Sequence, residues 1–262
     1  MAKAPAPAGG VSGNVLLYQN PVPLTKETHS KMGVSATAKP FDFLRKAHFV
    51  PVTAPEFGAA ANSYPLIFAG EAKNPLAVMG IRGEENLFVQ DDGQFNPDFY
   101  MPAFARRYPF VLAGDEANNR FVVCVDEKAD CVAKKNPERP FFEGEELSAF
   151  TQEAFEFLQA FERDRRATED MIKVFNEHDL FEQKEMNFQG NNPDGSLAPK
   201  QKIAEYFAIT EERLKKLDDK ALRMFADRGY LAVAYAHIMS LSNWQRLVNI
   251  TLRKVQDEQA AA

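Results

Sequence analysis

The chain of 262 residues is poor in the residues that build covalent or metal-bound frameworks. Its two cysteines, Cys124 and Cys131, fit neither the CxxC spacing of redox and zinc sites nor a disulfide framework, so we expect both thiols to be reduced. No stretch approaches the roughly 18 apolar residues of a membrane-spanning helix, and residues 1–13 lack the apolar core of a secretory signal. These absences favour a cytoplasmic protein, with export to the cell surface without a cleavable signal as the alternative.

Motifs of the common catalytic classes are also absent. The chain has no GxSxG nucleophile elbow, no Walker sequence and no GxGxxG turn, and its 4 histidines show no HExxH spacing. We therefore expect no cofactor and no metal site. Two histidines are nevertheless candidate ligand-binding residues: His237, on a strongly apolar helical stretch, and His29, in a proline-flanked segment. For each, the simpler interpretation is a hydrogen-bonded histidine of the core.

The chain has many charged residues, and they are unevenly distributed along it. The net charge is -6, and residues 143–185 alone carry thirteen acids against five bases. Phosphate binding needs clustered lysine and arginine, so this excess argues against a nucleic-acid partner. We interpret the acidic residues as the solvated face of a helix.

The periodicity of apolar residues predicts an α+β fold. Residues 14–142 read as short strands broken by proline, glycine and asparagine, whereas residues 143–256 are mainly helical. No Pro/Gly/Ser-rich linker separates the halves, which predicts a single domain over 14–256 with one shared core, preceded by a disordered tail, 1–13.

Within the second half, the pattern predicts an amphipathic helix from about residue 146, a second helix capped by Thr168, and a long helix over about 230–255. A short helix capped by Asp218 or Asp219 is expected between the second helix and the long helix. Two strands, joined by a loop at 190–195, are expected near residues 186–188 and 202–207.

An internal repeat appears when the chain is shifted by 44 residues: YPLIFAG at 64–70 aligns with YPFVLAG at 108–114. Both copies read as a helical turn, a Tyr-Pro pair, a strand, a turn and a second strand. If the repeat is structural, the two hairpins superpose strand for strand, and the strand ends at Arg82 and Asp126 become equivalent and able to approach. Chance similarity between two ordinary hairpins is the alternative.

The densest local cluster of charge and aromatic rings is Arg106, Arg107 and Tyr108. Guanidinium groups at the entrance to a strand can clamp a carboxylate or phosphate, which makes these three residues candidate ligand contacts. The simpler interpretation is an internal ion pair with Asp126 and Glu127.

The 22 phenylalanines are expected to fill the core, with one exception. Phe141 and Phe142, beside a Glu-Gly pair, are candidates for an exposed patch that contacts a protein partner.

Five phrases that occur in this order resemble the SapC family: PVTAPEF (51–57), YPLIF (64–68), NLFV (86–89), RRYPF (106–110) and YAHIMSL (235–241). The resemblance spans residues 14–250. It implies a bacterial protein linked to a surface layer or its assembly, near peptide or nutrient handling. It supplies no catalytic residues that can be carried over to this chain.

Residues and resemblance together lead us to expect a non-enzymatic module that binds a protein or peptide partner. A structural component of the surface layer and an uncharacterised enzyme are the alternatives. An enzyme would be favoured if Arg106, Arg107, His29 and His237 converged on one enclosed pocket.

Overall fold

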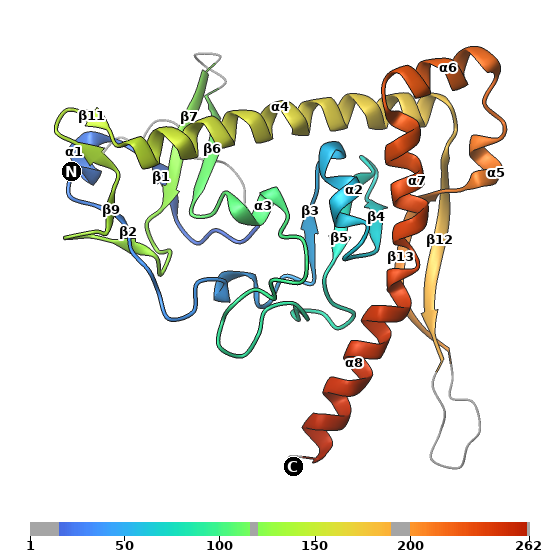
Figure 1. Cartoon of the computed structure of the whole chain (residues 1–262), viewed down its shortest axis with the longest axis horizontal. Helices are drawn as coiled ribbons and strands as arrows, with labels where there is room; N and C mark the ends of the chain where they lie inside the picture. Colours follow the sequence, from blue (N-terminus) through green and yellow to red (C-terminus); the bar gives the residue numbers. More distant parts are fainter. Residues whose placement is uncertain (1–15, 116–119, 190–199, 261–262) are drawn as a thin grey trace, which may run out of the picture. The chain divides into compact units, whose positions relative to one another are not determined.

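The computed structural model describes residues 16–115, 120–189 and 200–260, and it confirms the α+β class (Figure 1). The expected tail, 1–13, and the loop at 190–195 lie outside these residues. The chain groups into two compact units, and each is described by itself. Unit 1 comprises residues 1–44, 91–94 and 105–163, and unit 2 comprises 45–90, 95–104 and 164–262. The single shared core stays a prediction.

The strands are β1 (Pro21–Pro23), β2 (Gly33–Val34), β3 (Phe49–Pro51), β4 (Leu66–Ala69), β5 (Asn74–Val78), β6 (Phe110–Asp115), β7 (Arg120–Asp126), β8 (Val132–Ala133), β9 (Arg139–Pro140), β10 (Phe142–Glu143), β11 (Glu146–Leu147), β12 (Phe181–Phe188) and β13 (Gln201–Ile209). The α-helices are α1 (Lys26–His29), α2 (Phe57–Ala60), α3 (Ala103–Arg106), α4 (Ala149–Glu177), α5 (Glu211–Leu214), α6 (Asp219–Asp227), α7 (Tyr230–Ser240) and α8 (Asn243–Ala260). Two 3₁₀ turns, η1 (Asp42–Leu44) and η2 (Ala54–Glu56), complete the set.

Unit 1 is built from three small antiparallel sheets, in the orders β1-β7-β6, β8-β2-β9 and β10-β11, and from the first half of α4. Its main core cluster joins these elements through five buried residues: Met32, Phe110, Val125, Phe141 and Leu158. Phe141 is completely buried. The prediction that it forms an exposed patch is therefore wrong, because its ring packs edge-on against Phe110, with centroids 5.5 Å apart.

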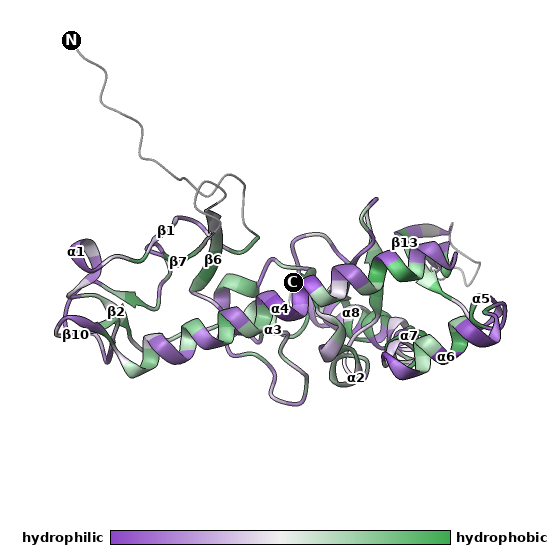
Figure 2. Ribbon diagram, turned by 90° about the horizontal axis from the view of Figure 1, so that it is seen from above, coloured by the Kyte–Doolittle hydropathy of each residue, from purple (hydrophilic) through white to green (hydrophobic). Residues whose placement is uncertain are grey.

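Unit 2 has one antiparallel sheet, in the order β12-β13-β4-β5-β3, together with α2, α5 to α8 and the second half of α4. Its interior is aromatic: the ring of Phe68 lies 4.9 Å from that of Phe181, and Phe175 stacks on Phe225 at 5.5 Å. Figure 2 shows α4 alternating between hydrophilic and hydrophobic colours, as an amphipathic helix does.

Two predicted helix ends are wrong. Thr168 does not begin a helix but lies inside α4, where its hydroxyl donates to the Asp164 carbonyl at 2.6 Å, four residues back. The long helix expected over 230–255 is two helices, since α7 ends at Ser240 and α8 begins at Asn243. Ser240 donates to the carbonyl of His237, and Asn243 donates to that of Ser240, so polar side chains satisfy backbone groups at the break.

Two further predictions are confirmed in outline. Asp218 caps α6 by accepting a hydrogen bond of 2.7 Å from the amide of Ala221. The two strands expected around the 190–195 loop are β12 and β13, both longer than the pattern indicated.

The element order predicted from the 44-residue repeat is confirmed, but the residue-for-residue equivalence ends after the first strand. Both Tyr-Pro pairs precede the first strand of an antiparallel hairpin, β4-β5 in one sheet and β6-β7 in another. However, Leu66 lies opposite Ala77, whereas its equivalent, Phe110, lies opposite Val125 instead of Phe121. The second strand is thus displaced by four residues, and the strand-for-strand superposition is wrong.

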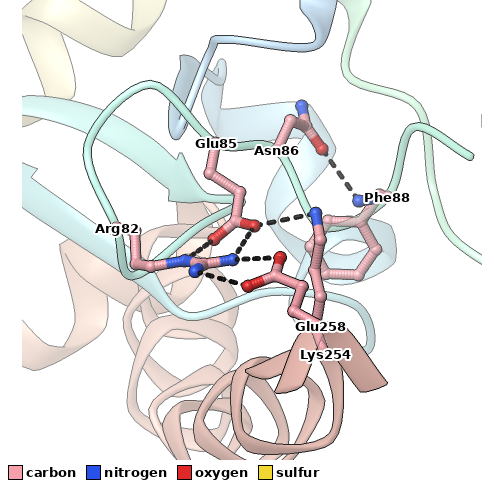
Figure 3. Close-up of polar contacts among 6 residues, drawn as sticks. All are labelled: Arg82, Glu85, Asn86, Phe88, Lys254 and Glu258. Atoms are coloured by element: carbon pink, nitrogen blue, oxygen red, sulfur yellow. Dashed lines mark hydrogen bonds and ion pairs between the residues drawn. The ribbon is translucent and has the colours of Figure 1, made fainter. Parts of the chain in front are cut away.

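The two strand-end charges, Arg82 and Asp126, also have different roles. Asp126 is fully buried and accepts main-chain amides from Gln19 at 2.7 Å and Asn20 at 2.9 Å. Arg82 belongs to a network in unit 2 that ties α8 to the loop after β5 (Figure 3). Its guanidinium donates to Glu85 and Glu258.

Candidate functional site

A groove of about 570 Å³ in unit 1 contains the three residues of the predicted arginine cluster. Its walls come from the segment 34–43, the chain from the end of α3 into β6, the start of β9 and the first two turns of α4. Arg106, Arg107 and Tyr108 all line it, so the structure brings these candidates to one concave surface.

Two arginines of the groove lie over aromatic rings of α4. The guanidinium carbon of Arg139 is 4.4 Å from the centre of the Phe150 ring, and that of Arg106 is 5.3 Å from the centre of the Phe157 ring. Phe150 and Phe157 are seven residues apart, which places them on one face of the helix about 10 Å from each other. A guanidinium lying over a ring is held by cation–π attraction, and its N–H groups point outward in the plane of the group.

Arg107 has a different setting from its neighbour Arg106. It is half-buried, and its guanidinium carbon lies 4.9 Å from the centre of the Phe161 ring and 5.7 Å from that of Tyr18. The Tyr18 hydroxyl donates to the Phe110 carbonyl at 2.7 Å. Burial raises the pKa of Tyr18 to about 12 although Arg107 opposes the shift. Arg107 therefore has a packing role in unit 1 as well as a place in the groove wall.

Tyr108 forms part of the aromatic wall. Its ring stacks on that of Phe43 with centroids 3.9 Å apart and an angle of 14° between the planes. Burial, with the nearby Asp126 and Cys131, raises the pKa of the Tyr108 hydroxyl far above its usual value. At neutral pH this hydroxyl is protonated and can donate a hydrogen bond to an anionic ligand.

His29, one of the two candidate histidines, lies in unit 1 but does not line the groove. Its ring is buried, with Nδ1 3.0 Å from the Thr25 carbonyl oxygen and Nε2 3.3 Å from a carboxylate oxygen of Glu127. These contacts hold α1 in place.

His237 belongs to the core of unit 2. Its Nε2 accepts a hydrogen bond of 3.0 Å from the amide of Ile209, and its ring lies 5.1 Å from that of Phe68. Burial lowers the pKa of His237 to about 4, so the ring is neutral at pH 7. His237 thus lies in unit 2 and is not part of the groove of unit 1.

Sequence reasoning missed Arg139, Phe150 and Phe157 as groove residues. Arg139 follows a short loop and reaches the groove because β9 pairs with β2, which lies more than a hundred residues earlier in the chain. No local motif signals such a pairing. The phenylalanines were recognised only as part of an amphipathic stripe, the face that a helix normally turns to the core.

No three His, Cys, Asp or Glu side chains of 16–115, 120–189 and 200–260 gather as a metal ion would require. None of the helices in those ranges combines the length and apolarity needed to cross a bilayer.

Comparison with protein-family models found a match. The family model described as SapC matches residues 24–247, most of the chain. No curated protein matches, and no solved structure matches.

Proposed function

The chain belongs to the SapC family, and from this membership and the groove of unit 1 we propose that it is a non-enzymatic module that binds a peptide segment bearing carboxylates. The observation that carries the proposal is the pair of guanidinium groups, Arg106 and Arg139, each lying over a ring of α4 in one groove. In its biological setting, the peptide would belong to a component of a bacterial surface-layer system.

The charge of the groove supports a carboxylate ligand. Its wall carries three arginines against two glutamates, Glu138 and Glu153, on a chain whose net charge is -6. The carboxylate of Glu138 accepts a hydrogen bond from the amide of Ala36 at 3.1 Å. The groove is therefore a basic site on an acidic protein, which favours an anionic partner.

The spacing of the arginines supports an extended ligand. The two rings beneath them are about 10 Å apart along α4, and an extended peptide rises about 3.3 Å per residue. Two carboxylates separated by two to four residues can therefore meet both guanidinium groups. Phe43, Phe110 and Tyr108 provide apolar wall for the residues between them.

The titratable groups of the groove support binding over catalysis. Burial raises the pKa of the Cys131 thiol to about 11, so almost none of it is thiolate at neutral pH. Tyr108 is likewise protonated. Neither group has the pKa near neutrality that suits a general base or an activated nucleophile.

Fluorescence anisotropy with labelled ten-residue peptides tests the proposal. The peptides carry zero, one or two glutamates at spacings of two, three or four residues. We expect the doubly acidic peptides to bind and the double variant R106A/R139A to weaken binding at least tenfold, because a hydrogen bond to a charged group contributes about 1.5–3 kcal/mol. The matched control is Arg163→Ala, an exposed arginine of α4 that does not line the groove.

Circular dichroism must show that the double variant retains its fold. The proposal is wrong if no acidic peptide binds, or if the folded double variant binds as tightly as the wild type. The link to a surface layer is tested separately by locating the protein in fractionated bacterial cells.

A further inference from the structure

The outward face of α7 in unit 2 is apolar and exposed. The helix has no Asp, Glu, Lys or Arg, and its one titratable side chain besides tyrosine, His237, is buried. Tyr235 is 47% exposed and Met239, one turn later, is 70% exposed. A helix that is apolar all round is normally covered on all sides, so this face has the composition of an interface. Tyrosine and methionine are also enriched in interfaces.

Tyr235 and Met239 also form part of the wall of a slot on this face. It has a volume of about 420 Å³ between α2, α7 and the start of α8. Small residues form much of its wall, including Gly58 and Ala61 on one side and Ala232 and Ala236 on the other. A Cβ atom added at Gly58 would meet no atom within 4 Å, so the slot is open there.

The slot is almost free of charge. Among the described residues that line it, Arg246 alone is charged, and its guanidinium donates to the carbonyl of Asn62 at 2.7 Å. A charged partner segment would lose hydration in this slot without gaining an opposite charge, whereas an uncharged, flexible side chain fits it. Met239 is such a side chain, and it protrudes from the same face.

We propose that this face is the interface of a homodimer in which Met239 of each copy enters the slot of the other. A twofold axis makes one surface complementary to itself, and this face carries both the protruding side chain and the slot that such symmetry requires. With the axis near the middle of α7, the two helices run antiparallel, and the two Arg246 side chains lie at opposite ends of the interface. The uncharged side chain of Met239 would thus enter an uncharged slot. The two Arg246 side chains would not lie close enough to repel each other.

Sedimentation equilibrium over a hundredfold range of protein concentration tests the proposal. We expect the wild type to dimerise and Met239→Glu to weaken dimerisation at least tenfold. Leu222→Glu is the control, because Leu222 is an exposed apolar residue (44%) on α6 that does not line the slot. This variant should dimerise like the wild type. Gly58→Leu, whose Cβ meets no atom within 4 Å and whose side chain would occupy the slot, should also give a monomer.

A wild type that stays monomeric at the highest concentration overturns the proposal. So does a folded Met239→Glu that dimerises as the wild type does. If Met239→Glu fails to fold, Gly58→Leu decides by the same criterion. The interface does not depend on the peptide groove, so Met239→Glu should bind the acidic peptides with unchanged affinity.

Discussion

The amide of Ala54 donates a hydrogen bond of 2.8 Å to the hydroxyl of Thr168, which lies in the interior of α4. The same hydroxyl donates to the carbonyl of Asp164, so one buried side chain joins the start of η2 to the helix. A threonine inside a helix often bonds back in this way and leaves its oxygen able to accept from elsewhere.

Replacing Thr168 with valine should destabilise the protein by about 1–3 kcal/mol, because the Ala54 amide loses its acceptor. Thr168→Ser keeps the hydroxyl and should lose less. Urea unfolding followed by circular dichroism measures both. Equal stability of Thr168→Val and the wild type would show that the bond contributes nothing.

Phe110 is the centre of the unit 1 core, since it is 3% exposed and belongs to the cluster with Val125, Phe141 and Leu158. Phe110→Ala should cost about 3–5 kcal/mol in the free energy of unfolding, because it removes apolar contacts and leaves a cavity. Phe110→Leu preserves more of the volume and should cost less. The same unfolding assay checks the order, and equal losses for the two variants would contradict it.

His237 should make stability fall in acid. The folded protein holds the pKa of this ring at about 4, below the unfolded value of 6.5, so the unfolded chain binds more protons between these values. The contribution of this ring to the free energy of unfolding is at its maximum above pH 6.5. It falls by about 3 kcal/mol as the pH falls towards 4. His237→Gln does not titrate there, so its loss of stability between pH 7 and pH 4 should be smaller than that of the wild type. Parallel curves for the two proteins would refute the assignment.

The two glutamates of the network around α8 should contribute unequally to the stability of the protein (Figure 3). Glu85 accepts hydrogen bonds from Arg82 at 2.6 and 2.7 Å, and Lys254 lies 2.8 Å from it. These two partners hold the pKa of Glu85 below its usual value. Glu258 is more exposed and contacts only Arg82 in this network, at 3.3 Å.

We therefore expect Glu85→Gln to destabilise the protein more than Glu258→Gln, whose effect should stay within about 1 kcal/mol. Thermal unfolding at low and high salt measures both changes. Salt should reduce the effect of Glu258→Gln more, since exposed charges are screened more strongly. The reverse order of the two variants would contradict the prediction.

The single shared core predicted from the sequence can be tested by calorimetry. One domain gives one unfolding transition whose calorimetric and van't Hoff enthalpies agree. Two separate transitions would show that units 1 and 2 unfold independently.

Local signals predicted much of the fold. The sequence offers Asp218 or Asp219 as the cap of α6, and the structure shows that Asp218 is the cap. This contact is local, so the prediction could come close. Thr168 misled the prediction since the same hydroxyl that caps free amides can instead bond back inside a helix, and the choice depends on Ala54, more than a hundred residues away. The break between α7 and α8 was missed for a similar reason: Asn243 also donates to the carbonyl of Ala61, a contact that the local pattern does not contain.

The candidate site was predicted in part. Arg106, Arg107 and Tyr108 are neighbours in the sequence, so their density of charge and rings was visible there. Arg139 completes the groove only because β9 pairs with β2, a long-range contact that creates the site and leaves no local trace. The chemistry of imidazole makes His29 and His237 candidates in the sequence, but both have the core-like surroundings of the simpler interpretation.

The two prolines of β1 limit the ability of this sheet edge to pair with another strand. Leu24 donates to the carbonyl of Val123 on β7, and the alternation of an antiparallel pair turns the amide of Val22 the same way. The outward positions on this edge are thus Pro21 and Pro23, which have no N–H to offer. An incoming strand finds no donors there, so this edge resists both aggregation and strand addition. A ligand of unit 1 must then be recognised by its side chains and not by backbone pairing along β1.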